Sequence, residues 1–251
     1  MRILVAIPVF NEQKHVSRVL SRVREHADDV LIIDDGSTDE TPEILNRLRN
    51  PLRLDLIRHE ANAGYGRSLR EAFRRAADRD FDWVITMDCD EQHEPEALPR
   101  FFERCRAGES DIISGSRYLH ESERDGSPPA DRRAINATIT EELNERLGLA
   151  LTDGFCGYKA HRVGALRELE LTENGYAFPM QFWVQAAAAS LRVEEIPVSL
   201  IYNDPNRSFG GGLDVPDVRL DHYRCVMHKE IERLADRLPD ARRPAPAGCP
   251  G

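Results

Sequence analysis

The chain has 251 residues, of which 41% are hydrophobic and 31% charged, a composition typical of an ordinary globular protein. Its formal net charge at pH 7 is −10, and because non-specific binding to nucleic acid requires a basic face, we expect no nucleic-acid partner. The five cysteines form no CxxC pair and leave an odd one over, which favours a reducing compartment over a disulfide framework. We therefore expect a cytoplasmic protein.

One stretch approaches the length of a membrane span. Residues 174–191 carry no charge, but they include Pro179, Gln181 and Gln185, and alanines supply much of their apolar character. A spanning helix needs about 20 strongly apolar residues, so we predict a helix of a globular domain here and no transmembrane segment. The apolar run at the N-terminus is too short for a signal peptide.

Short runs rich in Val, Ile and Leu alternate with helical patterns through the first half of the chain. The runs are typical of buried parallel strands and lie at 3–9, 30–34, 53–57, 83–87 and 111–114. Between them apolar residues recur at helical spacing, as in the series Val16, Val19, Leu20 and Val23. This alternation predicts an α/β domain with a mostly parallel sheet flanked by helices.

The second half of the chain is less regular. Residues 119–133 combine Gly, Ser, two Pro and many charges, which predicts an exposed, mobile loop. Apolar periodicity predicts the remaining elements, which are helices at 135–147, 180–191 and 214–238 and a strand at 194–202. We expect residues 1–238 to form one domain, followed by a disordered tail rich in Pro and Gly at 239–251.

Polar clusters directly follow four of the predicted strands. They read "FNE" (10–12), "DDGSTDE" (34–40), "NAGYGRS" (62–68) and "DCDEQH" (88–93). Acidic pairs arise often by chance in so acidic a chain, and the last cluster alone could be a solvated turn before a helix. The carboxyl ends of parallel strands, however, meet at one edge of a sheet, where α/β proteins bind ligands. Four clusters at one edge therefore favour a ligand site.

A nicotinamide-dependent dehydrogenase is the first alternative to consider for such a sheet. Its fingerprint would be GxGxxG directly after the first strand. That strand is followed by "PVFNEQK", which contains no glycine, and "GYGRS" (64–68) follows the third strand instead. The sequence therefore argues against nicotinamide chemistry.

Six motifs, taken in order, resemble those of inverting glycosyltransferases with the GT-A fold, the dolichyl-phosphate mannosyltransferase type of glycosyltransferase family 2. They are "IPVFNE" (7–12), "VLIIDDGSTDET" (30–41), "NAGYG" (62–66), "MDCDEQHEPE" (87–96), "SGSRY" (114–118) and "GYAFPM" (175–180). The resemblance covers about residues 1–210. It implies a GT-A fold, a UDP- or GDP-linked sugar donor and a polyprenyl phosphate acceptor, so that the protein would be peripheral to a membrane.

The resemblance also implies roles for residues of the donor half. Pro8, Asn11 and Glu12 would line the nucleotide pocket, with Asp35 close to the base or ribose.

The acidic cluster would hold a metal ion. Asp88 and Asp90 would be the DxD pair that, with Gln92, binds a divalent cation, and hard oxygen ligands suit Mg²⁺ or Mn²⁺. Such a metal bridges the donor diphosphate and neutralises the charge that develops as it leaves. Asp88 and Asp90 are therefore candidate catalytic residues.

The acceptor half departs from the family pattern. Relatives usually have Arg-x-x-x-Ser where this chain has Arg132 and Asn136, and a Glu where it has Gln181. An ionised phosphate acceptor needs cations and no general base, so a non-titrating Gln181 favours a phosphate over a hydroxyl acceptor. Arg117, a third candidate catalytic residue, would form a phosphate clamp with Arg132 and Arg133, and Asn136 could donate a hydrogen bond.

Two loops are candidates for lids over the donor, because lids of this composition exclude water from transfer reactions. They are residues 119–133 and the segment "NDPNRSFGG" (203–211). We expect Arg207 and Ser208 to reach the diphosphate on closure. Two other hypotheses stay open: the same donor chemistry with a hydroxyl acceptor on a soluble or cell-envelope molecule, and a catalytically silent protein that binds sugar nucleotides.

Overall fold

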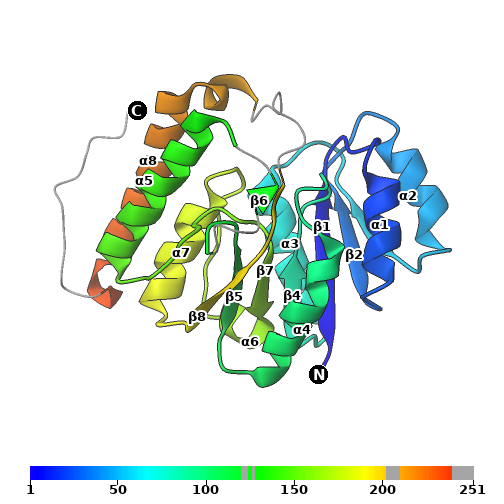
Figure 1. Ribbon diagram of the computed structural model, residues 1–251, viewed down its shortest axis with the longest axis horizontal. Coiled ribbons are helices and arrows are strands. Elements are labelled where there is room, and N and C mark those ends of the chain that lie inside the picture. The colour runs from blue at the N-terminus through cyan, green and yellow to red at the C-terminus, as the bar shows by residue number, and fades with distance from the viewer. Residues whose placement is uncertain (120–123, 126–127, 202–209, 239–251) are drawn as a thin grey trace.

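A seven-stranded sheet forms the centre of the computed structural model, which describes residues 1–119, 124–125, 128–201 and 210–238 (Figure 1). Its strand order is β3-β2-β1-β4-β7-β5-β8. The strands are β1 (Ile3–Val9), β2 (Val30–Asp34), β3 (Asp55–Arg58), β4 (Trp83–Thr86), β5 (Ile112–Ser116), β7 (Lys159–Arg162) and β8 (Val193–Pro197). All neighbours pair in parallel except β7, which is antiparallel to both β4 and β5. The predicted α/β fold with a mostly parallel sheet is confirmed.

Helices cover both faces of the sheet because the strands alternate their side chains between the faces. On β1, Val5 and Ile7 face one core and Leu4 and Ala6 the other. The first core is completed by α1 (Val16–Arg24), α2 (Thr41–Arg49) and α4 (Leu98–Ala107). The second is completed by α3 (Tyr65–Asp78), α5 (Ala130–Leu147), α7 (Phe178–Ala188) and α8 (Pro216–Arg233), and α6 (Val163–Leu166) follows β7.

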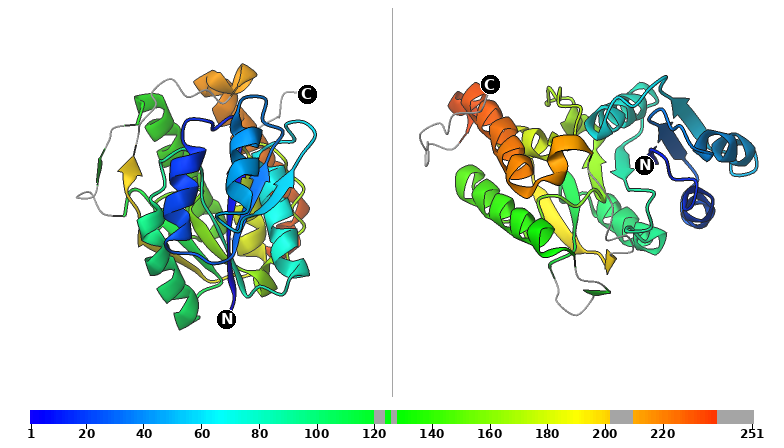
Figure 2. Two further views of the ribbon diagram at one scale, coloured as in Figure 1. Left: turned by 90° about the vertical axis from the view of Figure 1, so that its right-hand side faces the viewer. Right: turned by 90° about the horizontal axis from the view of Figure 1, so that it is seen from above.

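The two ends of the sheet carry different helices. Helices α5 and α8 lie side by side at one end, and α1 and α2 lie at the other (Figures 1 and 2). A separate pair of short strands, β6 (Arg124–Asp125) and β9 (Leu200–Ile201), joins the segment before α5 to the segment after β8. In the described part of the chain, no helix combines the length and the apolarity needed to cross a membrane.

Two predicted boundaries are wrong, and one strand was not predicted. The strand expected at 194–202 is two strands, because β8 ends at Pro197, which has no N–H to continue the ladder, and β9 then pairs with another partner. The loop expected at 119–133 ends early, since α5 begins at Ala130. The strand β7 was missed because its sequence "KAHR" is polar, although Lys159 and His161 are both buried.

His161 is a buried titratable group inside the apolar core. Its ring lies between those of Phe73 and Phe182, at centroid distances of 4.9 and 5.1 Å. Burial disfavours the charged imidazolium and lowers the pKa of His161 to about 3. The folded protein therefore holds this histidine neutral at any pH above that value.

The protein should lose stability as the pH falls below about 6.5, the pKa of histidine in the unfolded chain. Below that pH the unfolded state binds a proton at His161 that the folded state does not bind. His161 alone should therefore lower the free energy of unfolding by about 2 kcal/mol between pH 7 and pH 5. Urea unfolding of wild type and His161→Phe at both pH values measures how much His161 contributes to this loss of stability. The variant should lose about 2 kcal/mol less than wild type, and an equal loss in both proteins would refute the assignment.

Candidate active site

A cavity of about 940 Å³ opens at the carboxyl edge of the sheet. It brings together the residues predicted for both halves of the site, although they lie far apart in the sequence. Those that line it are Pro8, Asn11, Glu12, Asp35, Asp88, Asp90, Gln92, Arg117, Arg132 and Asn136. Arg207 and Ser208 lie outside the described residues.

Hydrogen bonds tie the loop after β1 to the loop after β2. Asn11 has a left-handed backbone (φ 56°), and its Oδ1 accepts the Thr38 N–H at 2.8 Å while its own N–H donates to Ser37 Oγ at 3.0 Å. The N–H of Glu12 donates to Thr41 Oγ1 at 2.9 Å. These two loops therefore form one connected wall of the cavity.

Asp35 organises the third loop of this wall. Its buried carboxylate accepts the N–H groups of Ala63 and Gly64, each at 2.9 Å, and lies 2.7 Å from His59 Nδ1. Gly64 has a φ of 101°, a conformation that side chains rarely adopt. Asp35 lines the cavity, but both of its oxygens already accept hydrogen bonds from the protein.

The acidic residues after β4 divide between the cavity and the surface. Asp88 and Asp90 line the cavity with Gln92, whose N–H donates to Asp90 Oδ1 at 3.0 Å. The Glu91 carboxylate instead contacts Arg18 on α1, and Glu94 accepts a hydrogen bond from Ser199. Asp88 and Asp90 are therefore the carboxylates of this cluster that line the cavity.

These cavity residues fit a divalent cation. Asp88, Asp90 and the Gln92 amide oxygen are hard donors, and Mg²⁺ usually takes one or two carboxylates together with substrate phosphates and water. In the described ranges, no group of three or more His, Cys, Asp or Glu side chains forms a metal site by itself. A metal held here would thus take its remaining ligands from a bound substrate and water.

The Asp88 carboxylate lies in a tight pocket of its own. The Tyr65 hydroxyl, at the start of α3, hydrogen-bonds to it. Burial, followed by the negative charge of Asp88, raises the pKa of Tyr65 well above its usual value. Gly157 is packed against both groups, since a Cβ there would lie 2.6 Å from the Tyr65 hydroxyl and 2.9 Å from Asp88 Oδ2. Tyr65 was not predicted as a site residue.

His93 is buried beneath the acidic loop. Its Nδ1 accepts the Asp88 N–H at 2.9 Å. Burial lowers the pKa of His93 to about 4, so the ring is neutral at pH 7 and its 3.7 Å approach to Asp88 Oδ2 is no ion pair. The sequence offered the "QH" pair of the motif but no role for this histidine.

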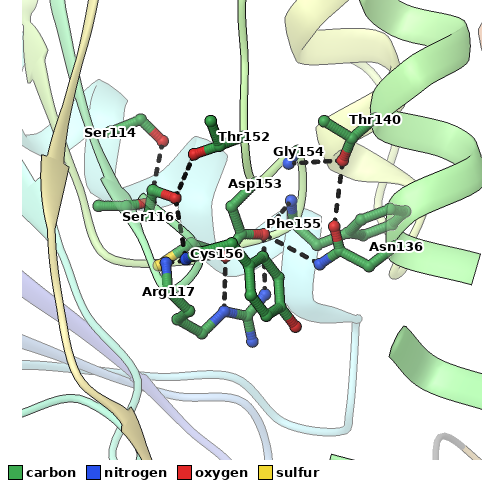
Figure 3. Close-up of polar contacts among 12 residues, drawn as sticks. Ser114, Ser116, Arg117, Asn136, Thr140, Thr152, Asp153, Gly154, Phe155 and Cys156 are labelled. Carbon is green, nitrogen blue, oxygen red and sulfur yellow. Dashed lines mark hydrogen bonds and ion pairs between the residues drawn. The ribbon is translucent and has the colours of Figure 1, made fainter. Parts of the chain in front are cut away.

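A buried carboxylate, Asp153, organises the cavity wall that contains Arg117 and Asn136 (Figure 3). Arg117 donates to it through Nε at 2.7 Å and through Nη2 at 2.9 Å, and Asn136 Nδ2 donates at 2.9 Å. Burial would raise the pKa of Asp153, but Arg117 and Asn136 outweigh burial and hold that pKa well below its usual range. The Arg117 side chain remains 21% exposed because it borders the cavity.

Two further arginines border the cavity from helices. Arg132 lies in the first turn of α5. Arg219 of α8 lines the cavity as well, and it donates to Asp131 at 2.8 Å and to the Leu213 carbonyl at 2.9 Å. It was not predicted, because α8 lies beyond the stretch that carries the family motifs.

Two predicted residues are not among the described residues that line the cavity. The Arg133 guanidinium lies 3.6 Å from the centre of the Tyr118 ring and borders a smaller surface pocket. Gln181 is buried between α7 and α8, where its Oε1 accepts the Thr172 and Glu173 N–H groups and its Nε2 donates to Glu230. The neutrality of Gln181 therefore says nothing about the acceptor.

The sequence matches the model of the family described as Glycosyl transferase family 2 over residues 4–170. The chain belongs to this family. Undecaprenyl-phosphate mannosyltransferase of Micrococcus luteus is 30% identical over 244 residues, which cover 95% of this chain and 99% of that protein. Polyprenol monophosphomannose synthase of Mycolicibacterium smegmatis is 29% identical over 205 residues, which cover 79% of this chain and 77% of that protein.

A solved structure of similar fold belongs to glucosyl-3-phosphoglycerate synthase of Mycobacterium tuberculosis, in complex with Mn²⁺, UDP and glucosyl-3-phosphoglycerate. It has a TM-score of 0.68 and 19% identity, and the match covers 96% of this chain and 81% of that one. This likeness confirms the GT-A fold. The protein is thus a family 2 glycosyltransferase, as its motifs indicated.

Gly157→Ala should damage the site with little effect on the fold, because the new methyl group must push the Asp88 carboxylate or the Tyr65 hydroxyl aside. We expect sugar transfer to fall about tenfold or more, since small displacements of reacting groups are costly. Gly164→Ala is the matched control, because nothing lies within 4 Å of its Cβ on α6. Full activity of Gly157→Ala would contradict the tight pocket.

Asp153→Asn should destabilise the protein by about 3–5 kcal/mol, because it leaves the Arg117 charge largely buried without its partner. Asp78→Asn is the control, since Asp78 pairs with Arg74 on the surface at 2.6 Å, and exposed pairs contribute about 0–1 kcal/mol. Urea unfolding at pH 7 compares the two variants. Equal, small losses would mean that the Asp153 pair does not organise this wall.

Proposed function

We propose that this family 2 glycosyltransferase moves a sugar from a nucleotide diphosphate donor to a polyprenyl phosphate, with inversion at the sugar carbon. The observation that carries the proposal is the cavity itself, in which the carboxylates of Asp88 and Asp90 and the guanidinium groups of Arg117 and Arg132 border one space. The first pair suits a cation with a diphosphate, and the second suits an anionic acceptor.

On the donor side, we propose that Pro8, Asn11 and Glu12 contact the nucleotide, while Asp35 shapes the pocket near the base or ribose. Asp88, Asp90 and Gln92 would hold Mg²⁺ or Mn²⁺. When bound, the metal would neutralise the diphosphate as it leaves. The similar synthase of M. tuberculosis, whose complex holds Mn²⁺ and UDP, supports this arrangement.

On the acceptor side, Arg117 and Arg132 would hold the acceptor phosphate. One phosphate oxygen forms a bond to the sugar C1 from the face opposite the diphosphate, the C1–O bond to the diphosphate breaks, and the nucleoside diphosphate leaves. A phosphate is already ionised at neutral pH, so no residue has to remove a proton. Asn136, whose Nδ2 donates to Asp153, would keep the Arg117 side chain in place.

The apolar side chains beside these arginines favour a lipid phosphate. Ile135, Phe155 and Tyr223 line the same cavity, and the Phe155 and Tyr223 rings lie 4.9 Å apart. Burial raises the pKa of Tyr223 to about 12, with Arg219 and Arg132 close enough to oppose that rise. Apolar surface next to cations suits a phosphate joined to an isoprenoid chain. The name of one sequence relative specifies an undecaprenyl phosphate, and the name of the other specifies a polyprenol monophosphomannose product. We therefore propose that the protein works at a membrane surface.

Arg132→Ala and Arg133→Ala form a matched pair of variants that tests the acceptor site. The two residues are neighbours on α5, but only Arg132 lines the cavity. Loss of a charge-assisted hydrogen bond weakens binding about 10- to 100-fold, so Arg132→Ala should lower transfer to a short polyprenyl phosphate by that factor. Arg133→Ala should stay within about threefold of wild type, and donor binding by thermal shift should be unchanged in both.

The Asp90→Ala variant and the addition of a chelator to wild type test the proposed metal site on the donor side. Both should abolish sugar transfer. Activity that survives the chelator would contradict the metal assignment. The hydroxyl-acceptor alternative predicts another result: glycosylation of an alcohol, no use of lipid phosphates and a rate that follows a titrating group between about pH 5 and 8. That result would overturn the lipid-phosphate proposal.

A further inference from the structure

The acidic loop after β4 closes on itself through one hydrogen bond. The Asp88 N–H donates to Nδ1 of His93, five residues later, at 2.9 Å. Between them, Glu91 adopts a left-handed backbone (φ 63°), which non-glycine residues rarely do. The loop therefore contains a strained turn that places the carboxylates of Asp88 and Asp90 at the cavity. His93 holds the backbone of Asp88, the first residue of this loop, through the hydrogen bond.

The tautomer of His93 follows from this geometry. Since Nδ1 accepts a hydrogen bond, the ring proton must be on Nε2, which lies 3.9 Å from Cys156 Sγ. The ring packs against Tyr158 at a centroid distance of 5.1 Å. His93 is 5% exposed and is not among the described residues that line the cavity, so its position is fixed by the protein from below the loop.

The Asp88 side chain is fixed at its other end. The Tyr65 hydroxyl donates to its carboxylate. Both groups pack against Gly157 so closely that a Cβ at this position would collide with them. With the backbone held by His93 and the carboxylate held by Tyr65, Asp88 has little freedom to turn away from Asp90. Two neighbouring carboxylates repel one another, so such restraint is needed before a cation arrives.

We propose that His93 is a positioning residue for the metal site, which it orients by accepting the Asp88 N–H without touching the metal or the substrate. This inference rests on the proposed function, because it requires that Asp88 bind a divalent cation. Groups that orient metal ligands affect metal affinity about 10- to 100-fold in known sites. The nucleotide pocket around Asn11 and Glu12 should not depend on His93.

Two substitutions separate the hydrogen bond from simple packing. His93→Phe keeps a ring against Tyr158 but has no acceptor for the Asp88 N–H. His93→Asn loses ring volume, but its Oδ1 is bonded to Cγ as Nδ1 is in histidine and can accept the same N–H. His161→Phe is the control, because it alters an equally buried histidine between Phe73 and Phe182, away from the acidic loop.

The measurement is Mn²⁺ binding, followed by electron paramagnetic resonance with saturating UDP or GDP, alongside calorimetry of nucleotide binding without metal. His93→Phe should weaken Mn²⁺ binding about tenfold or more, whereas His93→Asn and His161→Phe should stay within about threefold of wild type. Nucleotide affinity without metal should be the same in all four proteins. Amide exchange at Asp88, read by NMR, should be faster in His93→Phe than in His93→Asn.

Each contrary outcome has a separate meaning. If His93→Phe binds Mn²⁺ like wild type, or if His93→Asn is weakened as much as His93→Phe, the positioning role is wrong while the proposed function stands. If wild type binds no Mn²⁺ with either nucleotide, the metal-dependent function fails, and this role fails with it. Should His93→Phe not fold, His93→Gln takes its place, because its amide oxygen lies one bond too far out to accept the Asp88 N–H, and it must then show the same loss.

Discussion

Parallel strands that end at one edge of a sheet impose the constraint on which this site depends. Strands β1, β2 and β4 run in the same direction, so the loops that follow them meet. The antiparallel strand β7 adds to this arrangement, because its start pairs with the end of β4, with Lys159 opposite Thr86. The segment before β7 therefore enters the same edge and carries Asp153 and Gly157 into the site.

The cavity joins two opposite electrostatic environments. After β4, Asp88 and Asp90 concentrate negative charge that suits a cation. On the wall formed by Arg117 and Asn136, Asp153 is fully buried and neutralised by Arg117, which stays partly exposed at the cavity wall. A buried ion pair of this kind adds little net stability compared with apolar packing. Its value here is geometric, since the paired arginine is held in one orientation at the cavity wall.

Much of the fold, and many of the residues that line the cavity from the loops after β1, β2 and β4, could be predicted from the sequence. Runs of Val, Ile and Leu marked the parallel strands, and polar clusters after them marked the edge at which the cavity opens. Strand β7 could not be found this way, because the burial of Lys159 and His161 arises from neighbours distant in the sequence. Local pattern carries no information about such contacts.

The residues that line the cavity from α5 and α8 were predicted less completely, for related reasons. Arg132 and Arg133 are equivalent in the sequence, and only the start of α5 at Ala130 turns one toward the cavity and the other toward Tyr118. Arg219 reaches the cavity through the packing of α8 beside α5. In an arginine-rich chain, residue type alone could not single out these side chains.

The central claim is that one cation joins the two carboxylates after β4 to the donor diphosphate. Crystals grown with Mn²⁺ and UDP or GDP, measured at the manganese absorption edge, test it most directly. We predict a single strong anomalous peak within bonding distance of Asp88, Asp90 and the diphosphate oxygens. A nucleotide bound in the cavity with manganese elsewhere, or with none, would contradict it.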